Sequence, residues 1–181
     1  MKKLILIAFL TLSVITTQAQ EINWVTFEEA IELQKTNPKH IFMDMYTVWC
    51  GPCKMLDKNT FKNKSVAAYI NKNYYAVKFN AQGNEEVTFK GEKYTNPKYD
   101  PSKAKRRNSS HQLSSYFGVR AYPTIVFLDK DGMLITPLPG YRTPKQLELF
   151  LKLFKDDTYK EIKTKEEFTK YSENFKYEFT E

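Results

Sequence analysis

The sequence predicts a single α/β domain in which a central β-sheet is flanked by helices. The run 40–46 is mostly apolar and contains one acid, which is typical of a strand buried on both faces beneath helices. Elsewhere, apolar residues recur at helical spacing behind capping residues, so helices are expected between the strands. A chain of 181 residues with 41% hydrophobic and 15% aromatic residues is large enough to form one core.

The first elements follow from local signals. Residues 24–25 open a short strand, and Thr26 begins a helix because Glu29, three residues on, completes a capping box. The Asn-Pro pair at 37–38 ends this helix, since the residue before a proline avoids helical geometry. The inner face of the helix consists of Phe27, Ala30, Ile31 and Gln34, of which we expect the first three to be buried.

The middle of the chain continues with two helical segments and a strand. After the central strand 40–46, a helix is expected over about 52–62, because proline suits the first helical turn, where no backbone N–H is needed. A second helix is expected over 65–71 and a strand over 75–80. The inward positions of the second helix are Val66, Ala67 and Ile70.

The last part of the domain begins with a short helix over 111–117 and a buried strand over 124–128. A turn at 129–132 leads to a return strand over 133–136. The last helix of the domain begins at 143–146, Thr-Pro-Lys-Gln, with a cap, a proline in the first turn and a glutamine at the third position. Its apolar stripe is Leu147, Phe150, Leu151 and Phe154.

The two cysteines of the chain, Cys50 and Cys53, lie at the start of a predicted helix. Unpaired N–H groups and the positive end of the helix dipole favour a thiolate, so we expect the pKa of Cys50 to lie below that of a free cysteine. Cys53 lies about one helical turn further on, near enough to form a disulfide with Cys50, and is expected to be the less exposed of the two. Because the thiolate is the attacking form in disulfide exchange, Cys50 is the expected nucleophile and Cys53 the resolving thiol.

Residues 1–19 are expected to be a signal peptide. Two lysines precede an apolar stretch over 4–15, and Thr17-Gln18-Ala19 is a small-x-small cleavage signal. We therefore expect cleavage after Ala19 and export to the periplasm; an uncleaved membrane anchor is the alternative, for which the apolar stretch is short. Disulfides persist outside the cytoplasm, and two cysteines this close in sequence would add little as a staple, so a redox pair is the better explanation.

The pentapeptide 49–53, Trp-Cys-Gly-Pro-Cys, resembles the active site of the thioredoxin superfamily. Asp44 lies where thioredoxins carry a buried acid, and Pro123 resembles the cis-proline that faces the cysteines in that fold. The run 44–80 is most similar to thioredoxin-like domains of secreted bacterial disulfide reductases, including the periplasmic domain of the DsbD type. The resemblance implies a thioredoxin fold with a mixed sheet over 20–154, and a thiol-disulfide oxidoreductase that needs no cofactor beyond its redox-active disulfide.

The same resemblance implies roles for residues around the cysteines. Asp44, buried among apolar neighbours, is expected to have a raised pKa and to accept the proton of Cys53 through water. Lys78 is expected beside Asp44 and would modulate it. Trp49 is either an apolar platform that faces the substrate or part of the core.

The substrate would contact the loop around Pro123. A cis-proline would present the backbone of Ala121 and Tyr122 to an extended substrate peptide, with Thr124 beside it. Gly140 is expected beside the site, where a close backbone approach would require glycine. The dipeptide between the cysteines, Gly51-Pro52, resembles that of the reducing members of the superfamily.

Two segments depart from a minimal thioredoxin. Residues 81–112 form an insertion with seven Lys or Arg and four Asp or Glu, and the basic residues are densest at 103–107. This insertion is expected to be a solvated loop with a partly ordered hairpin, or a docking surface for a partner. Residues 155–181 form a C-terminal extension that is expected to pack on the domain, with a capped helix from Thr164 and an edge strand over 175–179. Phe168 and Tyr171 would be the apolar side of that helix.

Two other classes of function stay open. A Cys-x-x-Cys pair is half of a zinc site, so a protein that handles copper or zinc is one of them, although the chain has only His40 and His111, the latter expected on the surface. A disulfide oxidase or isomerase is the other, although these enzymes typically carry a histidine at the position of Pro52. The expected partners are protein disulfide substrates and a membrane thiol reductase as electron donor. A net charge of +7 without an arginine-rich helix indicates no nucleic-acid partner, and we expect a monomer.

Overall fold

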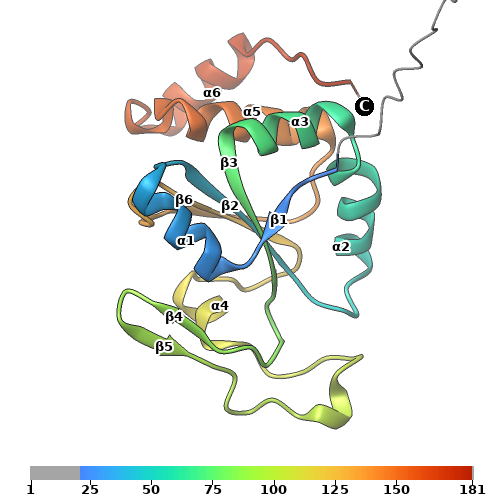
Figure 1. Ribbon diagram of the computed structural model, residues 1–181. Helices are drawn as coiled ribbons and strands as arrows, with labels where there is room; N and C mark the ends of the chain where they lie inside the picture. The colour runs from blue at the N-terminus through green and yellow to red at the C-terminus, as the bar shows by residue number, and fades with distance from the viewer. Residues whose placement is uncertain (1–20, 181) are drawn as a thin grey trace, which may run out of the picture.

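The computed structural model describes residues 21–180, and a five-stranded sheet lies at its centre (Figure 1). The strand order is β1–β3–β2–β6–β7. Strands β1 and β2 run parallel to β3, whereas β6 is antiparallel to β2 and β7 is antiparallel to β6, so the sheet is mixed, as expected. The strands are β1 (Trp24–Val25), β2 (His40–Tyr46), β3 (Tyr74–Asn80), β6 (Thr124–Leu128) and β7 (Leu134–Pro139).

Strand β2 is buried on both faces because helices cover the sheet on each side. Successive side chains of a strand point to opposite faces. Phe42 accordingly packs in one apolar cluster with residues of α3 (Lys64–Asn73) and α5 (Pro144–Lys155). The next residue, Met43, packs in a second cluster with residues of α1 (Phe27–Thr36) and α4 (Gln112–Tyr116). Figure 1 shows α3 and α5 together on one side of the sheet.

The predicted capping boxes at Thr26, Thr143 and Thr164 are all present, and α1, α5 and α6 (Lys165–Asn174) begin there. A box of this kind depends on residues three apart, so its two hydrogen bonds form within one turn. These helix starts are therefore local properties of the sequence.

The inner face of α1 differs from the prediction at its end. Ile31 is only half-buried, whereas Gln34 is 7% exposed. The side-chain amide of Gln34 donates to the carbonyls of Lys39 at 2.5 Å and Asp129 at 2.8 Å. A polar side chain is buried here because two loop carbonyls satisfy it.

The helix that follows Cys50 changes its geometry midway. The first part, α2 (Gly51–Leu56), is α-helical, and η1 (Asp57–Phe61) continues it as a π-helix. Within η1, Thr60 is buried and its hydroxyl donates to the carbonyl of Arg142 at 2.6 Å. Short π-segments inside α-helices are frequent at functional sites, and hydrophobic periodicity gives no sign of them.

The insertion 81–112 contains the expected hairpin, and its stretch 101–107 is exposed, as expected of a solvated loop, while other residues tie it to the domain. It contains β4 (Val87–Phe89), β5 (Glu92–Tyr94) and the short 3₁₀ helix η2 (Pro101–Lys103). The ring of Phe89 is buried with its centroid 5.0 Å from that of Phe27 in α1. The side-chain amide of Asn96 donates to the carbonyls of Gly83 and Ser109, both at 2.8 Å, and so joins the two ends of the insertion.

His111 is fully buried, so the expectation of a surface position is wrong. It is the N-cap of α4, where its Nδ1 accepts from the backbone N–H of Leu113 at 3.1 Å. Its Nε2 therefore carries the proton and donates to the carbonyl of Glu85 at 2.8 Å. Burial lowers the pKa of His111, in keeping with this neutral form.

The C-terminal extension packs on α5, but no strand forms over 175–180. It contains η3 (Thr158–Lys160) and α6, and the predicted apolar residues Phe168 and Tyr171 lie against the core cluster. The edge strand is replaced by a side-chain contact. The fully buried carboxylate of Glu148 in α5 accepts from the backbone N–H groups of Glu178 and Phe179 at 2.8–3.0 Å.

The predicted signal peptide, residues 1–19, lies outside the described residues. Within residues 21–180, no helix has both the length and the apolar character needed to cross a bilayer.

Candidate active site

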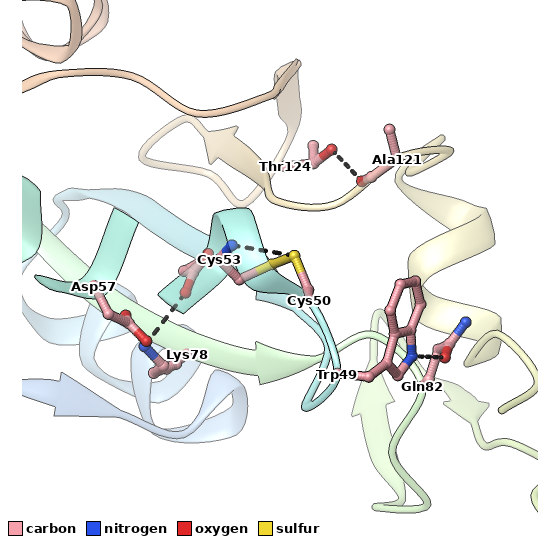
Figure 2. Close-up of a disulfide and its surroundings, with 9 residues drawn as sticks. Trp49, Cys50, Cys53, Asp57, Lys78, Gln82, Ala121 and Thr124 are labelled. Carbon is pink, nitrogen blue, oxygen red and sulfur yellow. Dashed lines mark hydrogen bonds and ion pairs between the residues drawn. A yellow bond between two sulfur atoms is a disulfide. The ribbon is translucent and has the colours of Figure 1, made fainter. Parts of the chain in front are cut away.

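The two cysteines form a disulfide at the N-terminus of α2, with their Cα atoms 5.3 Å apart (Figure 2). Cys50 is the N-cap of the helix, and the backbone N–H of Cys53 donates to the sulfur of Cys50 at 3.1 Å. This donor would also stabilise a Cys50 thiolate after reduction. The two cysteines are equally covered, each 3% exposed, so the expected difference in exposure is absent. Gly51 and Pro52, between them, are exposed.

The loop before β6 contains a cis peptide bond between Tyr122 and Pro123, as the resemblance implies. The hydroxyl of Thr124 donates to the carbonyl of Ala121 at 2.8 Å and so closes this loop. Within residues 21–180, the backbone N–H and carbonyl of Tyr122 have no hydrogen-bond partner. They are therefore available to an extended peptide.

Gly140 lies beside this loop, and its backbone N–H donates to the carbonyl of Pro123 at 2.8 Å. The reason for glycine differs from the expected close approach of backbone. An added Cβ would meet only the flexible side chain of Arg142 at 3.3 Å, whereas φ is +90°. Glycine is required here because other residues rarely adopt this backbone conformation.

Trp49 joins the disulfide to both the cis-proline loop and the insertion. Its ring centroid lies 6.1 Å from that of Tyr122, in an edge-on arrangement. Its indole N–H donates to Oε1 of Gln82 at 2.8 Å, as Figure 2 shows. The guanidinium of Arg107 lies over the ring at 4.8 Å from its centroid. Trp49 is half-buried between these groups and belongs to neither core cluster, so the prediction of a platform describes it better than core packing.

Asp44 and Lys78 are partners in the ladder between β2 and β3, and their side chains form an ion pair at 3.5 Å. Asp44 is 1% exposed, and within residues 21–180 its Oδ1 has no hydrogen-bond partner. Burial raises the pKa of Asp44 to about 7, although the Lys78 ammonium opposes the shift. The nearby carboxylate of Asp57 adds to the rise.

Lys78 is shared between two carboxylates. Its ammonium donates to Oδ1 of Asp57 in η1, and these two residues lie side by side in Figure 2. This contact is closer than the one to Asp44. The ammonium also lies over the rings of Trp24, Tyr46 and Phe61, at 5.2, 5.3 and 5.7 Å from their centroids. These contacts place the positive charge between the buried acid and the protein surface.

The sequence reasoning missed three residues of this region: Asp57, Gln82 and Arg107. Asp57 lies within the predicted helix 52–62, seven residues after Cys50 and so on the same face, but nothing in the sequence places it against Lys78. Gln82 and Arg107 approach Trp49 only through the fold of the insertion, for which the sequence gives no local signal. Arg107 was part of a basic cluster that was expected to be either solvated or a docking surface.

Neither histidine adds a ligand to the cysteines in this structure. His40 is buried, and its Nε2 lies 3.3 Å from the carboxylate of Asp157, while both nitrogens of His111 bond to the backbone. Within residues 21–180, no three side chains of His, Cys, Asp or Glu are grouped as metal ligands.

Comparisons with known proteins agree on the family. The model of the thioredoxin-like domain family matches residues 27–155. The thiol-disulfide oxidoreductase ResA of Bacillus thuringiensis subsp. konkukian is 26% identical over 122 residues, which is 67% of each chain. A solved thioredoxin-fold protein from Helicobacter pylori is 26% identical, with a TM-score of 0.55 over 74% of this chain and 80% of that one. A solved protein from Bacteroides thetaiotaomicron is 29% identical, with a TM-score of 0.51 over 75% of this chain and 94% of that one. The chain therefore belongs to the thioredoxin-like domain family and, with its Cys50–Cys53 pair, to the thiol-disulfide oxidoreductases within it.

Proposed function

We propose that the chain is an exported thiol-disulfide oxidoreductase that reduces protein disulfides with its Cys50–Cys53 dithiol. The observation that carries this proposal is the disulfide at the helix start beside the free backbone of Tyr122 in the cis-proline loop. Disulfide exchange with a peptide uses both features, because the backbone aligns an extended segment while a sulfur of the enzyme attacks it.

In the reducing direction, the thiolate of Cys50 attacks one sulfur of the substrate disulfide. The substrate S–S bond breaks, a disulfide between Cys50 and the substrate forms, and the departing thiolate takes a proton from water. The thiol of Cys53 then gives its proton to Asp44 and attacks the sulfur of Cys50. The second substrate thiolate leaves and is protonated, so the substrate gains the two electrons that the enzyme dithiol loses.

Asp44 is suited to the proton transfer. Its pKa of about 7 lies near neutral pH, where a general base is most effective, and Oδ1 is free to accept a proton. Lys78 favours the ionised carboxylate, which would otherwise be more costly in this buried position. Lys78 acts on the reaction through Asp44 and is a positioning residue.

The reducing direction rests on the dipeptide between the cysteines. Gly51 and Pro52 offer no side-chain donor to a Cys50 thiolate, so the reduced form gains less stabilisation than in an oxidase or isomerase with histidine there. We place the protein in the periplasm because the sequence predicts a signal peptide over 1–19. We further propose that it is a monomer and that a membrane thiol reductase reduces its disulfide again after each turnover.

Trapping of mixed disulfides tests the assignment of the cysteines. Cys53→Ser should accumulate disulfides between Cys50 and substrate proteins, because the resolving thiol is absent. Cys50→Ser is the matched control and should trap few. Equal trapping by the two variants would contradict the mechanism, and failure of the wild type to reduce insulin with a dithiol donor would contradict the activity.

A further inference from the structure

The insertion and the cis-proline loop enclose a cleft beside the disulfide. Its volume is about 470 Å³, and it is lined by Trp49 and Gln82, by Arg107 and Ser110 of the insertion, and by residues 119–122. Trp49 directly precedes Cys50, and residues 121–122 directly precede the cis-proline. The cleft therefore begins where a peptide in mixed disulfide with Cys50 would continue.

The charge of the cleft has one sign. Its charged side chains are Arg107 and Arg120, both exposed, and no carboxylate lines it. Within residues 21–180 neither guanidinium forms an ion pair, whereas nearby Lys103 pairs with Asp100 at 3.0 Å. Two planar cations thus line the cleft with no carboxylate paired to them among the described residues, and a guanidinium binds carboxylates through paired N–H donors.

The cleft is held in shape by hydrogen bonds to buried groups. Gln82 is 9% exposed, and its Oε1 accepts from the indole of Trp49 at 2.8 Å and from the backbone N–H of Asn108 at 2.9 Å. Asn108 in turn donates its side-chain amide to the carbonyl of Asp100 at 2.8 Å. The backbone next to Arg107 is therefore tied to the residue next to Cys50, and the guanidinium lies on that residue's ring.

We propose that this cleft binds acidic side chains that flank the substrate cysteine, so that the enzyme prefers protein disulfides in acidic segments. The inference rests on the proposed function and names the substrate class of the same site. In an extended peptide, residues within two positions of the reacting cysteine lie within about 7 Å of it, and the cleft is lined by Trp49, the residue next to Cys50. The two guanidiniums would attract such a segment on approach and pair with its carboxylates once it is docked.

The test measures how fast single-cysteine peptides, activated as pyridyl disulfides, form a mixed disulfide with the full chain carrying Cys53→Ser. Three peptides of equal length carry Glu, Gln or Lys on either side of the cysteine, and released pyridine-2-thione reports the rate. We expect the Glu peptide to react about five-fold faster than the Gln peptide at low salt, and the Lys peptide to be slowest. High salt should reduce these ratios towards one without any further substitution.

Added Arg107→Gln and Arg120→Gln should each lower the Glu-to-Gln rate ratio by about two-fold. We compare this ratio and not the rates themselves, because loss of a guanidinium near Cys50 also changes the reactivity of Cys50 towards every peptide. Lys98→Gln, which removes an exposed cation of the same insertion outside the cleft, should leave the ratio unchanged. Equal rates for the three peptides at low salt, or a ratio that Lys98→Gln lowers as much as Arg107→Gln, would overturn the inference. If no peptide reacts faster with the Cys53→Ser protein than with the Cys50→Ser protein, the proposed function itself fails.

Discussion

Asp44 should make the oxidised protein less stable as pH rises. Its pKa is 3.8 when unperturbed and about 7 in the folded protein, where it is buried. Between these values the folded protein keeps a proton that the unfolded chain has lost, so the folded state binds more protons and its stability falls with increasing pH. The fall is about 1.4 kcal/mol per pH unit and about 4 kcal/mol in all, and it levels off above pH 7.

Urea unfolding of the oxidised wild type and Asp44→Asn at several pH values measures this contribution. The variant should gain about 3 kcal/mol relative to the wild type between pH 5 and pH 8, because the amide does not ionise. The attraction of Lys78 for the ionised carboxylate is already contained in the pKa of Asp44, and effects of the substitution on packing do not depend on its ionisation, so the change with pH is the quantity to compare. Asp131→Asn, at an exposed position in the turn before β7, is the control and should show no such change. A difference between Asp44→Asn and wild type that stays constant to within about 0.5 kcal/mol would refute the reasoning.

Three further predictions concern other parts of the chain. The reduction potential of the Cys50–Cys53 couple, measured against glutathione, should lie nearer to about −270 mV than to about −120 mV. Pro52→His should raise this potential by at least about 30 mV, because an imidazole would stabilise the Cys50 thiolate. A wild-type potential near about −120 mV would indicate an oxidase instead. Glu148→Gln should lower the free energy of unfolding by about 2 kcal/mol and expose the C-terminal segment to trypsin. The reason is that the buried carboxylate accepts two backbone N–H groups and pairs with Lys152 at 2.7 Å. An equal loss of stability in Glu173→Gln, at an exposed position, would contradict this. N-terminal sequencing of the exported protein should begin at or within two residues of Gln20, and an intact Met1 in a membrane fraction would indicate an anchor.

The parts of the fold that could be predicted are those that short-range sequence determines. Each capping box involves residues three apart, and the burial of β2 follows from a run of apolar residues that no polar position interrupts except Asp44. The cis bond before Pro123 was predicted from the family resemblance, since nothing local in the sequence distinguishes Pro123 from another loop proline. The end of α1 could not be predicted because the partners that satisfy Gln34 include a carbonyl 95 residues away.

The contacts around the cysteines could not be predicted for the same reason, because they join residues that are distant in the sequence. The basic cluster in the insertion was visible in the sequence, but its position depends on Gln82, which binds Trp49 and Asn108 with one oxygen. Likewise, the edge strand was predicted from an alternating apolar pattern, whereas a single buried carboxylate on α5 satisfies the backbone of that segment. In both places the arrangement depends on one polar side chain, which hydrophobic periodicity does not reveal.

The position of Lys78 beside Asp44 was predicted correctly, but that position alone does not give the pKa of Asp44. Its place beside Asp44 follows from strand alignment, and a full ion pair there would hold the carboxylate ionised, at a pKa too low for a base at neutral pH. The structure instead divides the ammonium between Asp44 and Asp57, with the closer contact to the more exposed carboxylate. Attraction to Lys78 lets Asp44 ionise near pH 7, and burial lets it take up a proton at the same pH. Burial is thus the main cause of the raised pKa of Asp44, Lys78 opposes it, and Asp57, which lies in the π-helical segment η1, adds to it.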